Sequence, residues 1–144
     1  MLALWVGGIA IFTFIITPAI FNSYSRDMAG EIVGRLFPGY FLYNLVLSIL
    51  ALILFFVLRS DIQKGFRLSA FCLLIAVVVN TFVCFKLHPE IKTTKKEIHS
   101  FETVSNYDPL RVKFRRLHGI SAVLNLLLLA DGVTLLLVGT VRKK

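Results

Sequence analysis

Two histidines and one cysteine have the side-chain types and the spacing that suit a metal ion or a haem iron. Cys84 and His88 are four residues apart, which places both on one face of a helix. His118 begins a later apolar segment. If the two segments pack together, His88 and His118 reach one iron or transition metal, and Cys84 adds a ligand for a soft metal. The alternative is that each histidine bonds to a neighbouring side chain or to a lipid phosphate at the membrane interface.

A basic pair stands directly before one of these histidines. Arg115 and Arg116 precede His118 by a few residues, at the start of the last apolar segment. Guanidinium groups can clamp phosphate or carboxylate groups through paired hydrogen bonds. We therefore expect the three side chains to form the rim of a ligand cavity, or else to anchor the helix in the lipid headgroups.

Three asparagines fall at similar depths in three apolar segments. Asn44, Asn80 and Asn125 each lie about two helical turns from the same membrane face. Because an unpaired amide is costly in hydrocarbon, each of them needs a partner. They either form hydrogen bonds between helices or line a polar cavity that opens to that face.

Asp131 is the single formal charge inside the last apolar segment. A carboxyl group at that depth could relay protons or bind an ion. The alternative is a structural role, in which the group is protonated and hydrogen-bonded, since an isolated carboxylate in hydrocarbon is expected to lose its charge. Helical periodicity turns Asp131 away from the face that carries His118 and Asn125.

The elements that carry these residues are membrane helices. The chain has 144 residues, of which 57% are hydrophobic, and its mean hydropathy is +0.81. A helix needs roughly 20 apolar residues to cross the hydrocarbon core of a bilayer. Stretches of nearly that length carry no charge, or only Asp131. The sequence predicts one all-α membrane domain over residues 1–144, a four-helix bundle with transmembrane helices at about 1–21, 38–58, 66–87 and 112–141.

Two shorter amphipathic segments are predicted between these helices. Residues 25–37 alternate apolar and charged side chains with helical spacing, but they are too few to span, so an interfacial helix is expected there. Pro38 suits the first turn of the next helix. Pro89 predicts a break, and Ile91, Ile98 and Phe101 predict a second short surface helix before residue 112.

The net charge of +8 does not indicate a nucleic-acid-binding protein. The basic residues lie at the ends of apolar segments, where lipid phosphates account for them. The expected partners are membrane lipids and a small-molecule or metal ligand, and a homo-oligomer stays open. Ten basic residues fall on the face that holds both histidines against six on the other, which favours a cytoplasmic position for the first. The short basic turn over residues 59–67 argues the other way.

Five short sequences spread over nearly the whole chain resemble those of a known family: Trp5-Val6-Gly7-Gly8, Thr17-Pro18-Ala19-Ile20-Phe21, Ala29-Gly30-Glu31-Ile32-Val33-Gly34-Arg35-Leu36-Phe37-Pro38, His88-Pro89-Glu90-Ile91 and Phe114-Arg115-Arg116-Leu117-His118-Gly119. This is the transmembrane protein 205-like family of small four-helix membrane proteins. The architecture is also similar to the copper-resistance D proteins and to the haem-linked protoporphyrinogen oxidase. Both place histidines at helix ends, which implies haem or metal binding at His88 and His118.

These observations favour a protein that binds or transports a small ligand at a polar cavity near one membrane face. The ligand is expected to be a metal, haem, or an anionic lipid or metabolite. A haem-dependent membrane oxidoreductase and a non-catalytic structural or assembly subunit are the alternatives. The sequence shows no serine elbow, phosphate-binding glycine loop or paired membrane carboxylates, which argues against an enzyme. The expected location is the inner membrane of a bacterium.

Overall fold

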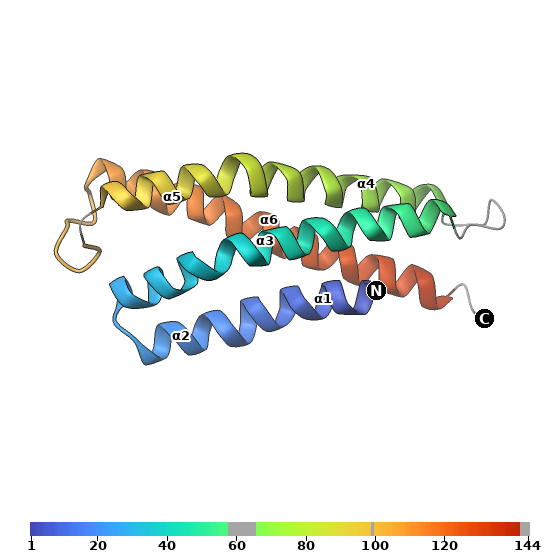
Figure 1. Ribbon diagram of the computed structural model, residues 1–144, viewed down its shortest axis with the longest axis horizontal. Helices are drawn as coiled ribbons and strands as arrows, with labels where there is room; N and C mark the ends of the chain where they lie inside the picture. The colour runs from blue at the N-terminus through green and yellow to red at the C-terminus, as the bar shows by residue number, and fades with distance from the viewer. Residues whose placement is uncertain (58–65, 99, 142–144) are drawn as a thin grey trace.

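The computed structural model describes residues 1–57, 66–98 and 100–141. Within these ranges, four helices are long and apolar enough to cross a membrane, and they lie side by side in an all-α bundle (Figure 1). Most of the predicted turn over residues 59–67 lies outside the described residues, as does His99. The N-terminus and the end of α6 lie at the same end of the bundle. The opposite end, where α2 and α5 finish, holds the candidate site.

The first long helix contains a wide turn just before a proline. It consists of α1 (Leu2–Ile11), the π-helical segment η1 (Phe12–Ile16) and α2 (Thr17–Ser23). Pro18 has no backbone N–H, and its ring would collide with the carbonyl of the residue four positions earlier in a regular helix. The wider π-helical turn accommodates this collision. The helix therefore passes through Pro18 and continues to Ser23, close to the predicted end at residue 21.

The predicted interfacial helix over residues 25–37 is not a separate element. It is the first part of α3 (Arg26–Val57), one helix of 32 residues that continues through Pro38. Its apolar side packs on the bundle, since Ala29 and Val33 are buried. The prediction was wrong because Pro38 removes only one backbone hydrogen bond, whereas burial of this face stabilises the continuous helix. At ~1.5 Å per residue, α3 is about 48 Å long and extends beyond the hydrocarbon core.

The predicted break at Pro89 and the separate surface helix after it are also wrong. Residues of α4 (Phe66–Phe82), η2 (Val83–Leu87) and α5 (His88–Glu97) form one continuous helix. A π-helical turn again ends two residues before the proline, as it does in the first long helix. The helix ends at Ile98, where the backbone becomes extended. Ile91 is buried within α5, so the apolar periodicity marked a buried helix face and not a helix on the membrane surface.

The last helix, α6 (Pro109–Val141), agrees with the predicted segment and begins slightly earlier than residue 112. Asp108 caps it, because its carboxylate accepts hydrogen bonds from the backbone N–H groups of Leu110 at 2.9 Å and Arg111 at 3.2 Å. At 33 residues α6 also exceeds the thickness of the bilayer core. Its first turns therefore stand at the headgroup level beside α5.

Two apolar clusters hold the bundle together. One surrounds Trp5, which is fully buried and packs with Ile9, Leu73 and other core residues. At Gly132 a Cβ atom would lie 2.6 Å from Val6 Cγ2, so α1 and α6 are in close contact there. The second cluster forms the floor beneath the candidate site and contains Phe41, Val83, Leu87 and Ile91.

Candidate functional site

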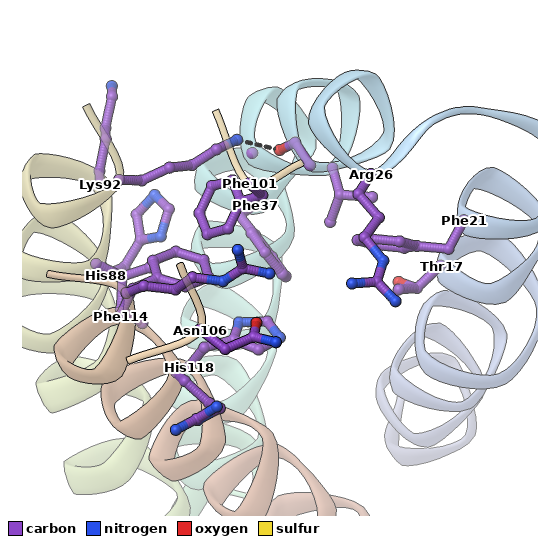
Figure 2. A pocket seen from close by; sticks show the side chains of 17 residues that line it. Thr17, Phe21, Arg26, Phe37, His88, Lys92, Phe101, Asn106, Phe114 and His118 are labelled. Atoms are coloured by element: carbon purple, nitrogen blue, oxygen red, sulfur yellow. Dashed lines mark hydrogen bonds between the residues drawn. The ribbon is translucent and has the colours of Figure 1, made fainter. Parts of the chain in front are cut away.

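A cavity of about 380 Å³ lies at the end of the bundle where α2 and α5 finish and α6 begins (Figure 2). Side chains from α2, α3, α5, α6 and the segment between α5 and α6 line it. Its volume falls in the range of small-molecule sites, about 300–1,000 Å³. The lining residues are Thr17, Phe21, Arg26, Gly30, Val33, Gly34, Phe37, His88, Ile91, Lys92, Lys95, Phe101, Asn106, Arg111, Phe114, Arg115 and His118.

The charge of the cavity wall is entirely positive. Five basic side chains line it, and none of the described lining residues is acidic. The two ion pairs among the described residues, Glu31–Arg35 at 2.6 Å and Glu90–Lys113 at 3.5 Å, do not involve the lining cations. Like charges that converge on a low-dielectric cleft focus a positive potential in it. The cavity is therefore suited to an anion. Its lining cations are Arg26, Lys92, Lys95, Arg111 and Arg115.

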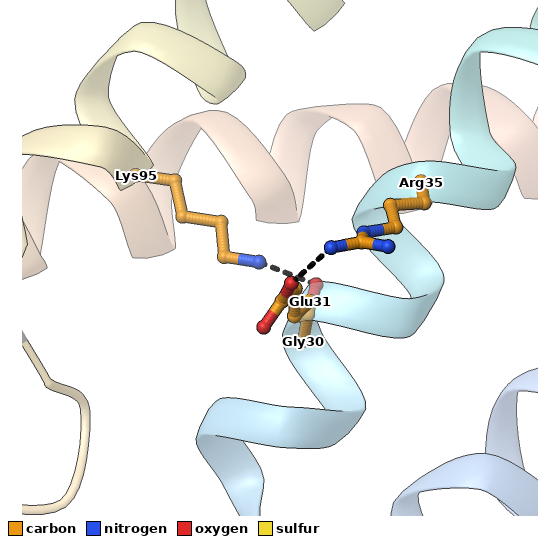
Figure 3. Close-up of polar contacts among 4 residues, drawn as sticks. All are labelled: Gly30, Glu31, Arg35 and Lys95. Atoms are coloured by element: carbon orange, nitrogen blue, oxygen red, sulfur yellow. Dashed lines mark hydrogen bonds and ion pairs between the residues drawn. The ribbon is translucent and has the colours of Figure 1, made fainter.

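Two glycines of α3 let a lysine lie against the helix backbone. Lys95 reaches across from α5 and donates a hydrogen bond to the carbonyl oxygen of Gly30 (Figure 3). A Cβ atom at Gly34 would lie 3.3 Å from Lys95 Nζ, closer than ordinary contact. The bond to a neutral carbonyl orients the ammonium group, and the Glu31 and Asp27 carboxylates nearby, which do not line the cavity, offset part of its charge. Figure 3 also shows the Glu31–Arg35 pair on the neighbouring turn of α3.

Both predicted histidines line the cavity, and one aromatic ring lies near both. The ring centroid of Phe37 is 6.0 Å from that of His88 and 6.4 Å from that of His118. His118 stacks on Phe114 with centroids 5.7 Å apart and planes 4° from parallel. His88 is only 9% exposed, and neither of its ring nitrogens has a hydrogen-bond partner among the described residues. His88 therefore lines the cavity, and both of its ring nitrogens are buried without a partner among the described residues.

The predicted third metal ligand does not join the histidines. Cys84 is half-buried and is not among the residues that line the cavity. Among the described residues, no group of three or more His, Cys, Asp or Glu side chains is placed to hold a metal ion. The spacing of Cys84 and His88 puts both on one helical face, but the η2 π-turn between residues 83 and 87 changes the angle between them.

The three predicted asparagines lie outside the cavity lining and bond within the bundle. Asn125 accepts a hydrogen bond from the Tyr40 hydroxyl and donates one to Thr13 Oγ1 at 2.8 Å, so it joins α6 to α3 and η1. Asn80 donates to Ser48 Oγ at 3.4 Å, and Asn44 donates to the Tyr40 carbonyl at 3.1 Å. Asn80 and Asn125 therefore bond between helices, whereas Asn44 bonds within α3 and its side-chain oxygen has no partner among the described residues.

The sequence predicted only some of the basic residues that line the cavity. Arg115 lines the cavity, whereas Arg116 is exposed and does not. A spacing of four and then three residues could have predicted which side chains share the cavity-facing side of a helix. Arg111, Arg115 and His118 on α6 have this spacing. The same spacing on α5 gives His88, Lys92 and Lys95. Arg26 could not be found in this way because it comes from a third helix.

Asp131 lies apart from the cavity. Its carboxyl group is within hydrogen-bonding reach of the Cys72 thiol, and its Oδ2 atom is buried with no partner among the described residues. Cys72 belongs to the apolar cluster around Trp5, far along the bundle from the cavity residues. The structure therefore does not connect Asp131 with the two histidines.

The segment after α5 closes one side of the cavity. Asp27, in the first turn of α3, accepts hydrogen bonds from the Ser100 hydroxyl at 2.6 Å and from the Phe101 N–H at 2.7 Å. These bonds place the Phe101 ring 4.9 Å from that of Phe114, where both line the cavity. Arg111 donates to a carbonyl of the same segment and lies 5.9 Å from the Phe101 ring centre.

Comparison with known proteins gives a family without an assigned activity. Residues 1–100 match the family described as Domain of unknown function (DUF4149). The chain belongs to this family. The match includes α5 with His88, Lys92 and Lys95, and it ends before α6. An uncharacterised protein of the bacterium Aquifex aeolicus (strain VF5) is 29% identical over 140 residues, which cover 96% of this chain and 92% of that protein. No solved structure matches.

Proposed function

We propose that this protein binds, and in doing so carries or presents, a small anionic amphiphile in the cavity between α2, α3, α5 and α6. The observation that supports this most strongly is the set of five lining cations without a lining carboxylate. Fixed positive charges in a cleft with low-dielectric walls raise the local concentration of anions. Arginine and lysine also donate charge-assisted hydrogen bonds to phosphate and carboxylate oxygens.

The walls between the cations favour a ligand that also has an apolar part. Aromatic rings from four elements line the cavity, namely those of Phe21, Phe37, Phe101 and Phe114. Phe21 lines the cavity and is 46% exposed, so we place an apolar opening of the cavity toward the lipid beside α2. A free inorganic anion would leave the apolar surface that these rings present to the cavity in contact with water, whereas a lipid or an apolar metabolite would cover it.

A haem group is the second candidate, because His88 and His118 line the same cavity. Its propionates would also meet the lining cations. Against it, the Phe37 ring lies near both imidazoles. An absorption spectrum of protein purified from haem-replete cells separates the two proposals. A Soret band that disappears in His118→Ala would favour haem and a membrane oxidoreductase.

The direct test of the proposed function is lipid selectivity. Native mass spectrometry of the detergent-purified protein would compare equimolar phosphatidic acid, phosphatidylglycerol and phosphatidylcholine with matched acyl chains. We expect the two anionic lipids to stay bound and the zwitterionic lipid to be displaced. Equal retention of all three, or no retention, would contradict the proposal and favour a structural or assembly subunit.

Three finer proposals accompany this one. We place the protein in the inner membrane of a bacterium, a proposal supported by its bacterial relative. We also propose that it is a distant member of the transmembrane protein 205-like group, on the short sequences that resemble that family. A homo-oligomer is a further proposal, which light scattering of the detergent complex tests directly.

A further inference from the structure

The cavity has two layers, which two antiparallel helices build with the same residue spacing. On α5 the order from the inside outwards is His88, Lys92 and Lys95, and on α6 the order from the outside inwards is Arg111, Arg115 and His118. Seven residues of helix span about 10 Å, so the imidazoles lie roughly that far below the outermost cations. The site therefore presents cations at its mouth, and the buried His88 stands at its floor.

His88 is the floor group with unmet hydrogen-bonding capacity. It is nine-tenths buried, and both ring nitrogens lack a partner among the described residues. The rings of Phe41 at 5.1 Å and Phe37 at 6.0 Å pack against it at steep angles, and neither offers a polar atom. Lys92, one turn away on the same helix, and the other lining cations oppose a further positive charge on the ring. A neutral imidazole has one N–H donor and one acceptor nitrogen.

The hydrogen-bonding chemistry of the His88 imidazole determines which functional group of the ligand can bind to it. A phosphate or carboxylate oxygen can accept a hydrogen bond from the imidazole N–H but cannot donate one to the other ring nitrogen, and the cations at the mouth compete for it. A hydroxyl group can accept from the imidazole N–H or donate to the other nitrogen, so it fits either tautomer. A buried group that lacks its partner destabilises the complex, so ligands without this hydroxyl are disfavoured.

We propose that the ligand is an anionic monoacyl glycerolipid with a free hydroxyl group, of the lysophosphatidic acid class. This inference rests on the proposed function and names the ligand class of the same site. The phosphate binds the mouth cations of α5 and α6, and the glycerol hydroxyl bonds to His88. The acyl chain passes Phe21 into the bilayer, through the apolar opening that we place beside α2. The depth order of phosphate, hydroxyl and chain matches the order in which a lipid stands in its own leaflet.

The experiment compares two lipids that differ by one oxygen atom. Isothermal titration of the full chain in detergent would use oleoyl lysophosphatidic acid and its 2-deoxy analogue, with glycerol 3-phosphate as a third ligand without a chain. We expect the hydroxylated lipid to bind about three- to tenfold more tightly than the deoxy analogue, the effect of about one neutral hydrogen bond. Glycerol 3-phosphate is expected to bind at least tenfold more weakly than the lipid.

A variant then assigns the difference to one side chain. In His88→Phe, which keeps a ring of similar shape, we expect both lipids to bind alike, whereas Asn22→Leu, an exposed position outside the cavity lining, should keep the wild-type ratio. Equal affinity of the two lipids for the wild-type protein overturns the hydroxyl assignment, while binding of either still supports the proposed function. Binding of neither lipid contradicts the proposed function itself. Tight binding of glycerol 3-phosphate would instead assign the site to a soluble anion. The comparison of the two lipids on the wild-type protein tests the hydroxyl assignment even if a variant fails to fold.

Discussion

Replacement of Asn125 by leucine tests whether this amide holds helices together or serves the ligand. Its side chain accepts from the Tyr40 hydroxyl and donates to Thr13, so one residue of α6 bonds to two other helical segments. Hydrogen bonds between membrane helices contribute about 0.6 kcal/mol on average and up to about 1.7 kcal/mol each. Loss of both bonds in Asn125→Leu should therefore lower the free energy of unfolding by about 1–3 kcal/mol.

The measurement is an unfolding titration with sodium dodecyl sulfate in mixed micelles. Trp5 is the single tryptophan and is fully buried, so its fluorescence reports on the loss of the bundle core. Asn22→Leu, which changes an exposed amide on α2, is the matched control and should unfold like the wild type. Ligand affinity of Asn125→Leu should stay within about twofold under folding conditions, since Asn125 does not line the cavity. Unchanged stability together with a large loss of affinity would refute the reasoning.

Two further predictions concern packing and the segment that closes the cavity. Gly132→Leu should destabilise the bundle by about 1–3 kcal/mol, because a Cβ atom there would lie 2.6 Å from Val6 Cγ2. Gly139→Leu is the control and should have little effect in the same titration, because a Cβ atom at Gly139 has open space. Asp27→Asn removes the charge from a group that accepts from the Phe101 N–H at 2.7 Å. Hydrogen exchange at that amide should become faster by about tenfold or more, and an unchanged rate would show that the carboxylate does not hold the segment.

The sequence predicted the membrane bundle because a helix that crosses lipid needs a long stretch without charged residues. This requirement does not depend on how the helices pack against one another. The proline positions misled the prediction for a physical reason. Pro38 and Pro89 lie in segments whose apolar faces are buried, and a π-helical turn before Pro89 absorbs its collision with the preceding carbonyl. The sequence carries the prolines but not the packing that decides whether a helix ends at them.

The sequence predicted those site residues that lie together on one face of a single helix. Arg115 and His118 lie on one face of α6 and do line the cavity. Arg26 was missed because it approaches from another helix. Lys95 shares a face of α5 with His88, a spacing that the sequence holds, but its bond to Gly30 depends on how α5 packs against α3. The amides were expected to form hydrogen bonds between helices or to line a polar cavity. Asn80 and Asn125 bond between helices, whereas Asn44 bonds to a carbonyl of its own helix.

Charge-matched double variants test the central claim, that the cavity cations bind an anion, most directly. Arg111→Gln with Arg115→Gln removes two lining charges, and Arg35→Gln with Arg116→Gln removes two charges outside the lining, so both proteins have the same net charge. Hydrogen bonds to charged groups contribute about 1.5–3 kcal/mol, so the first protein should bind oleoyl lysophosphatidic acid at least tenfold more weakly than the wild type. The second should stay within about twofold of the wild type, since screened surface charges contribute little. Equal affinities of the two double variants for this lipid would contradict the account.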